Sequence, residues 1–156
     1  MRVLMLSWEY PPYVVGGMGK HVAELIPALM GREANGMPLQ IDVVTVRHGE
    51  APALEQSGDH VTIHRVMTPP LDPIDPFNSV VDGNLPLIAY ATELLNEQPY
   101  DILHVHDWLV AEAGIVLKLR HRVPLVTTIH ATERGRYHGY LLNETSKQID
   151  HMAVSY

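Results

Sequence analysis

The feature that most constrains the fold of this 156-residue chain is the alternation of short apolar runs with segments of helical periodicity. The runs have the length and the Val, Ile and Leu content of strands buried in a parallel sheet. They lie at residues 2–7, 40–46, 60–66, 101–106 and 124–129. Between them, apolar residues recur at helical spacing over residues 18–30, 82–96 and 108–121. This order predicts an α/β domain: a Rossmann-like parallel sheet with right-handed crossovers and helices on both faces.

Three segments fit this pattern less well. Pro27 lies inside the first expected helix, where a proline removes a backbone hydrogen bond. Residues 67–77 are rich in proline and predict a long irregular loop. After the last long strand we expect a helix over residues 139–149 and a short strand over residues 152–155. Because the sequence ends there without a linker, we expect the chain to be part of a longer protein.

Composition limits the function classes. Residues 1–156 suit one domain that can bury a sizeable core, and 46% of them are hydrophobic. No stretch approaches the roughly 20 apolar residues of a membrane helix, and the apolar N-terminal run meets Glu9 and two prolines too early for a signal peptide. The chain has no cysteine, which excludes disulfides and thiolate metal sites and agrees with a cytoplasmic location. A net charge of −7 repels a phosphate backbone, so nucleic acid is not an expected partner.

The residues that follow the strands are the first candidates for a site, because open parallel sheets bind ligands outside the carboxyl ends of their strands. Polar and aromatic residues gather after three strands, in the segments Ser7-Trp8-Glu9, His106-Asp107-Trp108 and His130-Ala131-Thr132-Glu133. Carboxylates and imidazoles suit the hydroxyls of a sugar, and indole rings suit its faces. The alternative is that strand ends are polar only because they face solvent.

Single residues within these segments have competing interpretations. Gly16 and Gly17 precede the first expected helix, where glycines and free N–H groups can approach a phosphate, although a plain tight turn also fits. Asp107 stands where an N-cap is expected, and capping is compatible with contact to a ligand. Trp108 suits either core packing or a sugar platform. His130 is the best single candidate for chemistry, and its alternative is a loop histidine that bonds local backbone.

His104 and His106 share one face of a strand, as in some zinc hydrolases. His104 falls inside the strand, however, where a buried core histidine is the simpler interpretation. No second group of histidines stands at comparable spacing to complete a ligand set. We therefore expect no metal.

Together these segments resemble the N-terminal domain of GT-B glycosyltransferases, specifically the retaining group (glycosyltransferase family 4/5 type) that contains bacterial glycogen and starch synthases. The resemblance spans essentially all 156 residues, and the order and spacing of its motifs are more specific than any one of them. The motifs are Ser7-Trp8-Glu9-Tyr10-Pro11-Pro12, Gly16-Gly17, Gly19-Lys20-His21-Val22-Ala23-Glu24-Leu25, His104-Val105-His106-Asp107-Trp108 and Thr128-Ile129-His130-Ala131-Thr132-Glu133.

The resemblance implies transfer of a sugar, glucose in this family, from an ADP- or UDP-sugar to a glucan or other acceptor, with retention and without a metal or other cofactor. Gly16 and Gly17 would bind the donor diphosphate. His130 would contact the transferred sugar. Asp107 and Glu9 would line the acceptor side, with Tyr10 and Trp108 shaping the groove.

The donor would bind mainly to a C-terminal Rossmann domain, which this chain lacks, so we expect the chain alone to be inactive. Two positions depart from classical glycogen synthases: Val14 stands where they have lysine, and Leu109 where they have histidine. The departures leave the nucleotide of the donor open. Two rival hypotheses are a stand-alone module that binds a glucan or sugar nucleotide, and a metal hydrolase built on His104 and His106.

Overall fold

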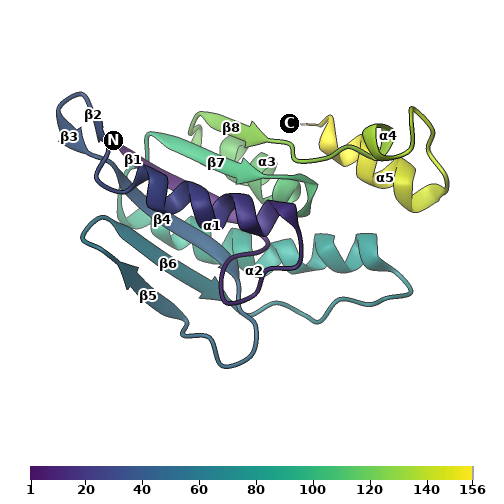
Figure 1. The fold of residues 1–156 in the computed structure, drawn as a ribbon, viewed down its shortest axis with the longest axis horizontal. Coiled ribbons are helices and arrows are strands. Elements are labelled where there is room, and N and C mark those ends of the chain that lie inside the picture. The colour runs from purple at the N-terminus through teal and green to yellow at the C-terminus, as the bar shows by residue number, and fades with distance from the viewer. Residues whose placement is uncertain (156) are drawn as a thin grey trace.

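The computed structural model describes residues 1–155 and confirms the predicted fold class, a mostly parallel sheet between layers of helices (Figure 1). The order across the six-stranded sheet is β5-β6-β4-β1-β7-β8, and only β5, at one edge, runs antiparallel to its neighbour. The strands are β1 Arg2–Ser7, β4 Gln40–Val46, β5 Leu54–Ser57, β6 Val61–Val66, β7 Ile102–His106 and β8 Leu125–Thr128. A small hairpin, β2 Glu33–Ala34 with β3 Met37–Pro38, lies apart from the sheet.

Helices cover both faces of the sheet. They are α1 Gly17–Leu29, α2 Pro76–Glu97, the 3-10 turn η1 Trp108–Val110, α3 Ala111–His121, α4 Glu133–Arg136 and α5 Glu144–Ala153. In Figure 1, α1 crosses one face, α2 and α3 lie against the other, and α4 and α5 lie beyond the carboxyl end of β8.

The central strand β1 shows how the sequence makes two cores from one sheet. Side chains alternate between faces along a strand, so Leu4 and Leu6 pack towards α2 and α3 while Val3 and Met5 pack towards α1. All four of these residues have 7% or less of their surface exposed. Burial on both faces explains why the apolar run is unbroken. A methyl group on Gly83 of α2 would lie 2.5 Å from Cη2 of Trp8, so this glycine lets α2 pack closely against the residue that follows β1.

The structure corrects the expected elements mainly near the C-terminus. The predicted strand over residues 152–155 is wrong, because α5 continues to Ala153 and its last turn is closed by the Val154 N–H, which donates to His151. The helix expected over residues 139–149 begins only at Glu144, where the Asn143 side chain caps it by accepting the Ser146 N–H at 2.8 Å. The apolar residues Met152 to Val154 thus extend a capped helix. The last residue, Tyr156, lies outside the described residues.

Other differences are smaller. Helix α2 begins at Pro76, six positions before the expected start, because Asp75 accepts the Asn78 N–H and proline suits a first helical turn. The edge strand β5 and the β2–β3 hairpin have no strong apolar pattern and were not expected. Pro27 lies within α1 as expected.

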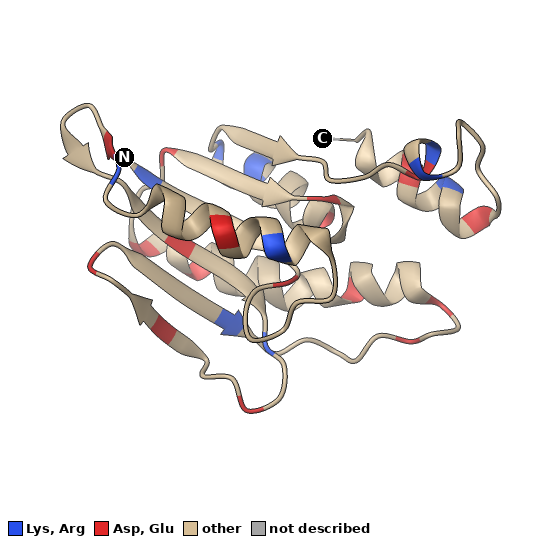
Figure 2. Ribbon diagram, in the orientation of Figure 1, with Lys and Arg blue, Asp and Glu red and all other residues tan. Residues whose placement is uncertain are grey.

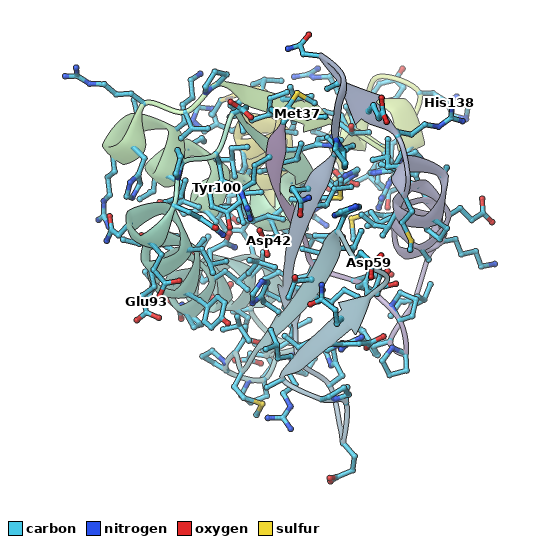
Figure 3. The ribbon with its side chains drawn as sticks, turned by 90° about the vertical axis from the view of Figure 1, so that its left-hand side faces the viewer. Met37, Asp42, Asp59, Glu93, Tyr100 and His138 are labelled. Carbon is cyan, nitrogen blue, oxygen red and sulfur yellow. The ribbon has the colours of Figure 1, made fainter. Side chains whose placement is uncertain are left out.

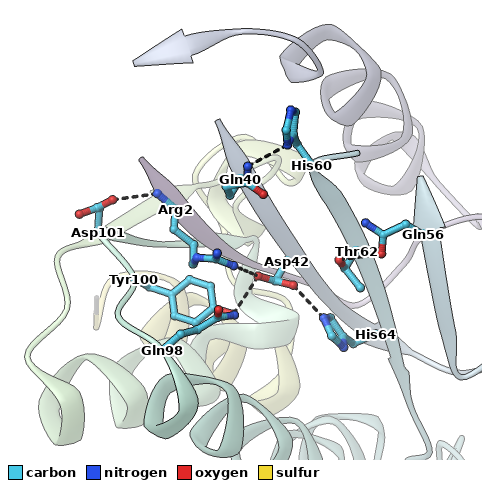
Figure 4. Close-up of polar contacts among 10 residues, drawn as sticks. All are labelled: Arg2, Gln40, Asp42, Gln56, His60, Thr62, His64, Gln98, Tyr100 and Asp101. Carbon is cyan, nitrogen blue, oxygen red and sulfur yellow. Dashed lines mark hydrogen bonds and ion pairs between the residues drawn. The ribbon is translucent and has the colours of Figure 1, made fainter. Parts of the chain in front are cut away.

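A polar cluster around Asp42 is buried near the amino ends of the strands (Figures 3 and 4). The Asp42 carboxylate accepts hydrogen bonds from the Tyr100 hydroxyl at 2.9 Å and pairs with His64 Nε2 at 3.0 Å, and Arg2 lies 3.4 Å from it. Burial alone would raise the pKa of Asp42, but the hydrogen bonds from His64 and Tyr100 outweigh burial and lower it. Asp42 is therefore a paired structural charge.

Charged residues of both signs are spread over the helices, strands and loops (Figure 2). At the corner formed by α4 and α5 they interleave, and Arg134 Nε lies 3.0 Å from an Asp150 carboxylate oxygen. None of the helices among residues 1–155 has the length and apolar character required to cross a membrane.

Candidate functional site

The candidate site lies beside β1, where the direction of the strand order reverses. The chain proceeds from β1 through α1 to β4 on one side, and later from β6 through α2 to β7 on the other side of β1. A crevice forms outside the carboxyl ends of strands at such a switch point, which is where open α/β sheets bind ligands. A cavity of 420 Å³ lies there. Its lining includes Glu9, Gly16, Gly17, Met18, Asp107, Trp108, Leu109, His130, Ala131 and Arg136.

The cavity thus brings together six of the seven residues predicted from the sequence. The exception is Tyr10, which lies outside it, buried between the sheet and α1 and beside a smaller cavity lined by Glu55 and Arg65. Burial raises the pKa of Tyr10. In this position the buried side chain of Tyr10 anchors the loop after β1 to the core on the α1 face.

The glycine segment forms the start of α1, and Glu9 holds it in place. One carboxylate oxygen of Glu9 accepts the N–H groups of Val15 at 2.8 Å and Gly16 at 3.1 Å. Gly16 is the N-cap and has no side chain to close the helix end, so the N–H groups of the first turn, from Gly17 onward, lack intrahelical partners. A methyl group on Gly16 or Gly17 would meet nothing within 4 Å. The first turn of α1 therefore presents unpaired donors and open space to the cavity, as an anion site requires.

Asp107 occupies an unusual backbone conformation at the end of β7. Its φ of 64° and ψ of 175° lie in a region that side-chain-bearing residues seldom adopt, at a cost of about 1–3 kcal/mol. The Asp107 carboxylate accepts the Trp108 N–H at 2.9 Å, and the Asp107 N–H donates to the Thr128 carbonyl at 2.9 Å. Burial raises the pKa of Asp107, against the lowering effects of the Trp108 N–H, His130 and Arg136. Strain of this kind persists where the surrounding structure imposes it. At this position the strained backbone places Asp107 in the lining of the cavity.

His130 belongs to a group of three histidines that the sequence separates widely. Its Nε2 lies 3.2 Å from Nδ1 of His106, the fully buried last residue of β7. The ring of His21, on α1, meets the His130 ring edge-on with centroids 4.9 Å apart. Ring nitrogens of the three histidines lie within 4.8 Å of one another.

Two of these histidines, His106 and His130, have lowered pKa values. Burial, and then the neighbouring His104, His130 and His21, lower the pKa of His106 to about 3. Burial likewise lowers the pKa of His130, which Asp107 raises and His21 lowers. Both rings are therefore neutral at pH 7 and act through single N–H donors and nitrogen acceptors.

Among the described residues, these three histidines are the group that could hold a metal ion. The sequence shows no second group of histidines at comparable spacing, so this one was not anticipated. His104 does not belong to this set, since its Nε2 contacts the Thr128 hydroxyl at 2.8 Å. Metal-bound histidines usually donate a hydrogen bond from the N–H of their other ring nitrogen to a carboxylate or carbonyl. His106 Nε2 is buried and has no hydrogen-bond partner among residues 1–155, so a metal on Nδ1 would leave an unpaired N–H in the core. The donor set favours a hydrogen-bonded pair of rings over a metal site.

Trp108 packs against the larger core and also lines the cavity. Its ring lies parallel to Phe77 of α2, at a centroid distance of 6.1 Å. Arg136 was missed by sequence reasoning, because it lies three residues beyond the motif that ends at Glu133. Arg136 is the only Lys or Arg among the described residues that line the cavity, and one of its guanidinium nitrogens lies 3.7 Å from the Glu133 carboxylate.

Comparison with known proteins identifies relatives of the whole chain. Residues 15–153 match the model of Glycosyltransferase Family 4. The chain is 37% identical over 166 residues to a glycogen synthase from Mycobacterium tuberculosis, and covers 38% of that protein with 96% of its own length. It is 34% identical to an uncharacterized glycosyltransferase from Methanocaldococcus jannaschii, of which it covers 36% with 97% of its own length. The chain therefore spans less than two fifths of these curated relatives.

Solved structures share the fold at low sequence identity. A sucrose-phosphate synthase from Thermosynechococcus elongatus superposes with a TM-score of 0.69 at 14% identity, over 99% of this chain and 40% of that one. The catalytic domain of starch synthase IV from Arabidopsis thaliana, bound to ADP and acarbose, superposes with a TM-score of 0.58 at 16% identity, over 85% of this chain and 34% of that one.

Proposed function

The chain belongs to glycosyltransferase family 4 as an N-terminal GT-B domain, and on that premise we propose that it forms the acceptor side of a retaining enzyme that transfers glucose from a nucleotide diphosphate sugar to a glucan or related acceptor. The single observation that supports this most is the convergence of the α1 N-terminus, Asp107 and His130 on one cavity at the switch point of the sheet. An anion site beside two groups that can bond hydroxyls suits a sugar diphosphate.

We assign the residues as follows. The open first turn of α1, at Gly16 and Gly17, stabilises the diphosphate as its bond to the anomeric carbon breaks and negative charge develops on the leaving oxygen. His130 contacts the transferred sugar beside that carbon. Asp107 lies towards the acceptor, whose hydroxyl oxygen forms the new bond to the anomeric carbon and passes its proton to the leaving diphosphate oxygen.

Arg136 is the one Lys or Arg among the described residues that line the cavity, and so takes the electrostatic role left open by Val14. Trp108 forms an apolar wall against which a sugar face can pack. Glu9 holds the glycine segment and borders the acceptor side. The proposal uses no metal ion: its charge stabilisation comes from helix N–H groups and a guanidinium.

The proposal requires a second domain. The relatives are more than twice as long as the part matched here. We propose that a C-terminal domain of the same protein binds most of the donor and closes over this cavity, so that residues 1–156 alone bind weakly and do not turn over. A cytoplasmic location is part of the proposal, since nucleotide sugars are made there.

The test measures nucleotide release from ADP-glucose and UDP-glucose, with and without a glucan acceptor, by the longer gene product and by residues 1–156. We expect turnover only by the longer protein, with the α-linkage of the donor retained in the product. His130→Ala lowers kcat/KM by at least a hundredfold, whereas the control His151→Ala, on the exposed side of α5, leaves it unchanged.

Absence of turnover by the longer protein with any sugar nucleotide, combined with binding of a glucan or nucleotide, would establish the rival hypothesis of a binding module. Stoichiometric zinc or manganese in the purified protein, with hydrolysis that chelators abolish, would instead establish a metal hydrolase.

A further inference from the structure

His106 lies at the centre of the site, yet the proposed function gives it no role. The residue ends β7, is fully buried, and does not line the cavity. Its Nδ1 lies 3.2 Å from Nε2 of His130, and its own Nε2 has no partner among the described residues. Such a contact between two ring nitrogens is a hydrogen bond only if one of them carries a proton. The position of that proton determines what His130 offers to a ligand.

Burial decides between the two arrangements. If His130 Nε2–H donated to His106 Nδ1, the proton of neutral His106 would lie on Nε2, as a buried N–H without an acceptor. Buried donors without acceptors are rare in native proteins. If His106 Nδ1–H donates instead, only a bare nitrogen lone pair remains in the core. The second arrangement puts the proton of His130 on Nδ1.

The sheet maintains the distance between the rings. His106 and Thr128 are paired in register between β7 and β8, and the next residue, Asp107, donates its backbone N–H to the Thr128 carbonyl at 2.9 Å. His130 follows two residues after Thr128, so both rings start from strand ends that are bonded together. The ring of His21 also contacts the His130 ring edge-on.

We propose that His106 is a positioning residue: its Nδ1–H donates to His130 Nε2 and holds His130 in the Nδ1–H tautomer. His130 then meets an oxygen of the bound ligand as a hydrogen-bond donor, and it does not act as a base. The identity of that ligand oxygen, on the transferred sugar or its diphosphate, rests on the proposed function. The tautomer itself does not, because it exists in the free protein.

Protonation does not disturb this arrangement near neutral pH. The groups that face the pair are His104 and His21, which lower the pKa of His106 together with burial, and Asp107, which raises the pKa of His130 against the effect of burial. The pKa values of both rings are lowered overall, so each carries one proton at pH 7.

The first test is nitrogen-15 NMR of the histidine rings in the metal-free chain at pH 7, which needs no substrate. We expect His130 to show a pyridine-type Nε2 and a protonated Nδ1, and His106 to show a protonated Nδ1. A protonated His130 Nε2 would overturn the proposal. Zinc added in one equivalent is expected to leave both ring spectra unchanged, and simultaneous coordination shifts on His21, His106 and His130 would overturn it as well.

Variants test whether His106 is the cause. In His106→Leu we expect His130 to shift towards the Nε2–H tautomer, which predominates for histidine in water. In His106→Asn, whose amide nitrogen can occupy the place of Nδ1, we expect the native tautomer to be retained. The matched control is His104→Asn, which removes the neighbouring ring on the same strand but not the bond to His130.

In the longer protein, His106→Leu should lower kcat/KM about tenfold and His106→Asn should restore most of it, at equal thermal stability. A His106→Leu protein with the native His130 tautomer would refute the inference. If His106→Leu does not fold, the wild-type spectrum still decides. A native tautomer without transferase activity would refute the proposed function alone.

Discussion

Gly17→Ala is the substitution that most directly separates the anion site from the stability of the fold. The structure shows open space at the position of the new methyl group, and Gly17 has no positive φ that a side chain would strain. Alanine is also the better helix former, by up to about 1 kcal/mol. We therefore expect the melting temperature to stay the same or rise.

Activity should respond in the opposite direction. The methyl group stands beside the cavity, where the diphosphate must approach the N–H groups of the first turn of α1. Loss of one hydrogen bond to a charged group is worth about 1.5–3 kcal/mol, which corresponds to a fall of roughly 10-fold to 150-fold in kcat/KM. The assay is nucleotide release by the longer protein at varied donor concentration, alongside a thermal melt of the same sample.

Gly19→Ala is the matched control on the same helix. Its new methyl group would lie 2.6 Å from the Glu9 carboxylate and 3.0 Å from Val14, so it should destabilise the fold by about 1–3 kcal/mol through overpacking. The reasoning is refuted if Gly17→Ala retains native kcat/KM for the donor, or if its activity falls only in proportion to a loss of folded protein.

Three further predictions concern other parts of the chain. Arg136→Gln should raise the KM for the donor about tenfold, by removing one charge-assisted hydrogen bond worth roughly 1.5 kcal/mol; initial-rate kinetics test this, and an unchanged KM would remove Arg136 from the site. Folded His106 has a pKa of about 3 against an ordinary 6.5, so the unfolded chain binds a proton that the folded chain excludes between these values. His106 should therefore contribute a fall of about 1.4 kcal/mol per pH unit to the free energy of unfolding as the pH drops below 6.5. Urea titrations at several pH values should show this dependence on pH reduced by about that amount in His106→Asn. Asp42→Ala should cost about 3–5 kcal/mol of stability, since it leaves His64 and Tyr100 buried without their partner, and denaturant titration at pH 7 measures this. Because Asp42 lies at the far edge of the sheet from the cavity, a specific loss of activity in the folded variant would contradict this description.

Local physical chemistry in the sequence was sufficient for the framework of the fold. Strand β1 is buried on both faces, so its apolar run is continuous, and the start of α1 follows from glycines before a run of helical period. Edge strand β5 lacks such a signal because three of its four residues are exposed. The strand expected over residues 152–155 failed since a three-residue apolar stretch is compatible with either period, and the Asn143 cap favours the helix.

The candidate site could be predicted to the same extent. The alternation of strands and helices along the chain and the rule for parallel sheets were enough to place Glu9, the glycine pair, Asp107, Trp108 and His130 at one edge, and the structure gathers them around one cavity. Tyr10 departs from this group because its side chain turns under the loop into the core next to α1. Arg136 joins through the short helix α4, which returns the chain towards the cavity.

What the sequence alone determined is therefore the alternation of elements, and with it the edge of the sheet where the candidate site lies. What only the tertiary structure decided is which side chains meet there. His21, His106 and His130 come from α1, β7 and the loop after β8, and no periodicity links positions so far apart. Their contact arises because β7 and β8 pair in register while the N-terminal turn of α1 crosses over the same strand ends, and a local pattern carries no information about such distances.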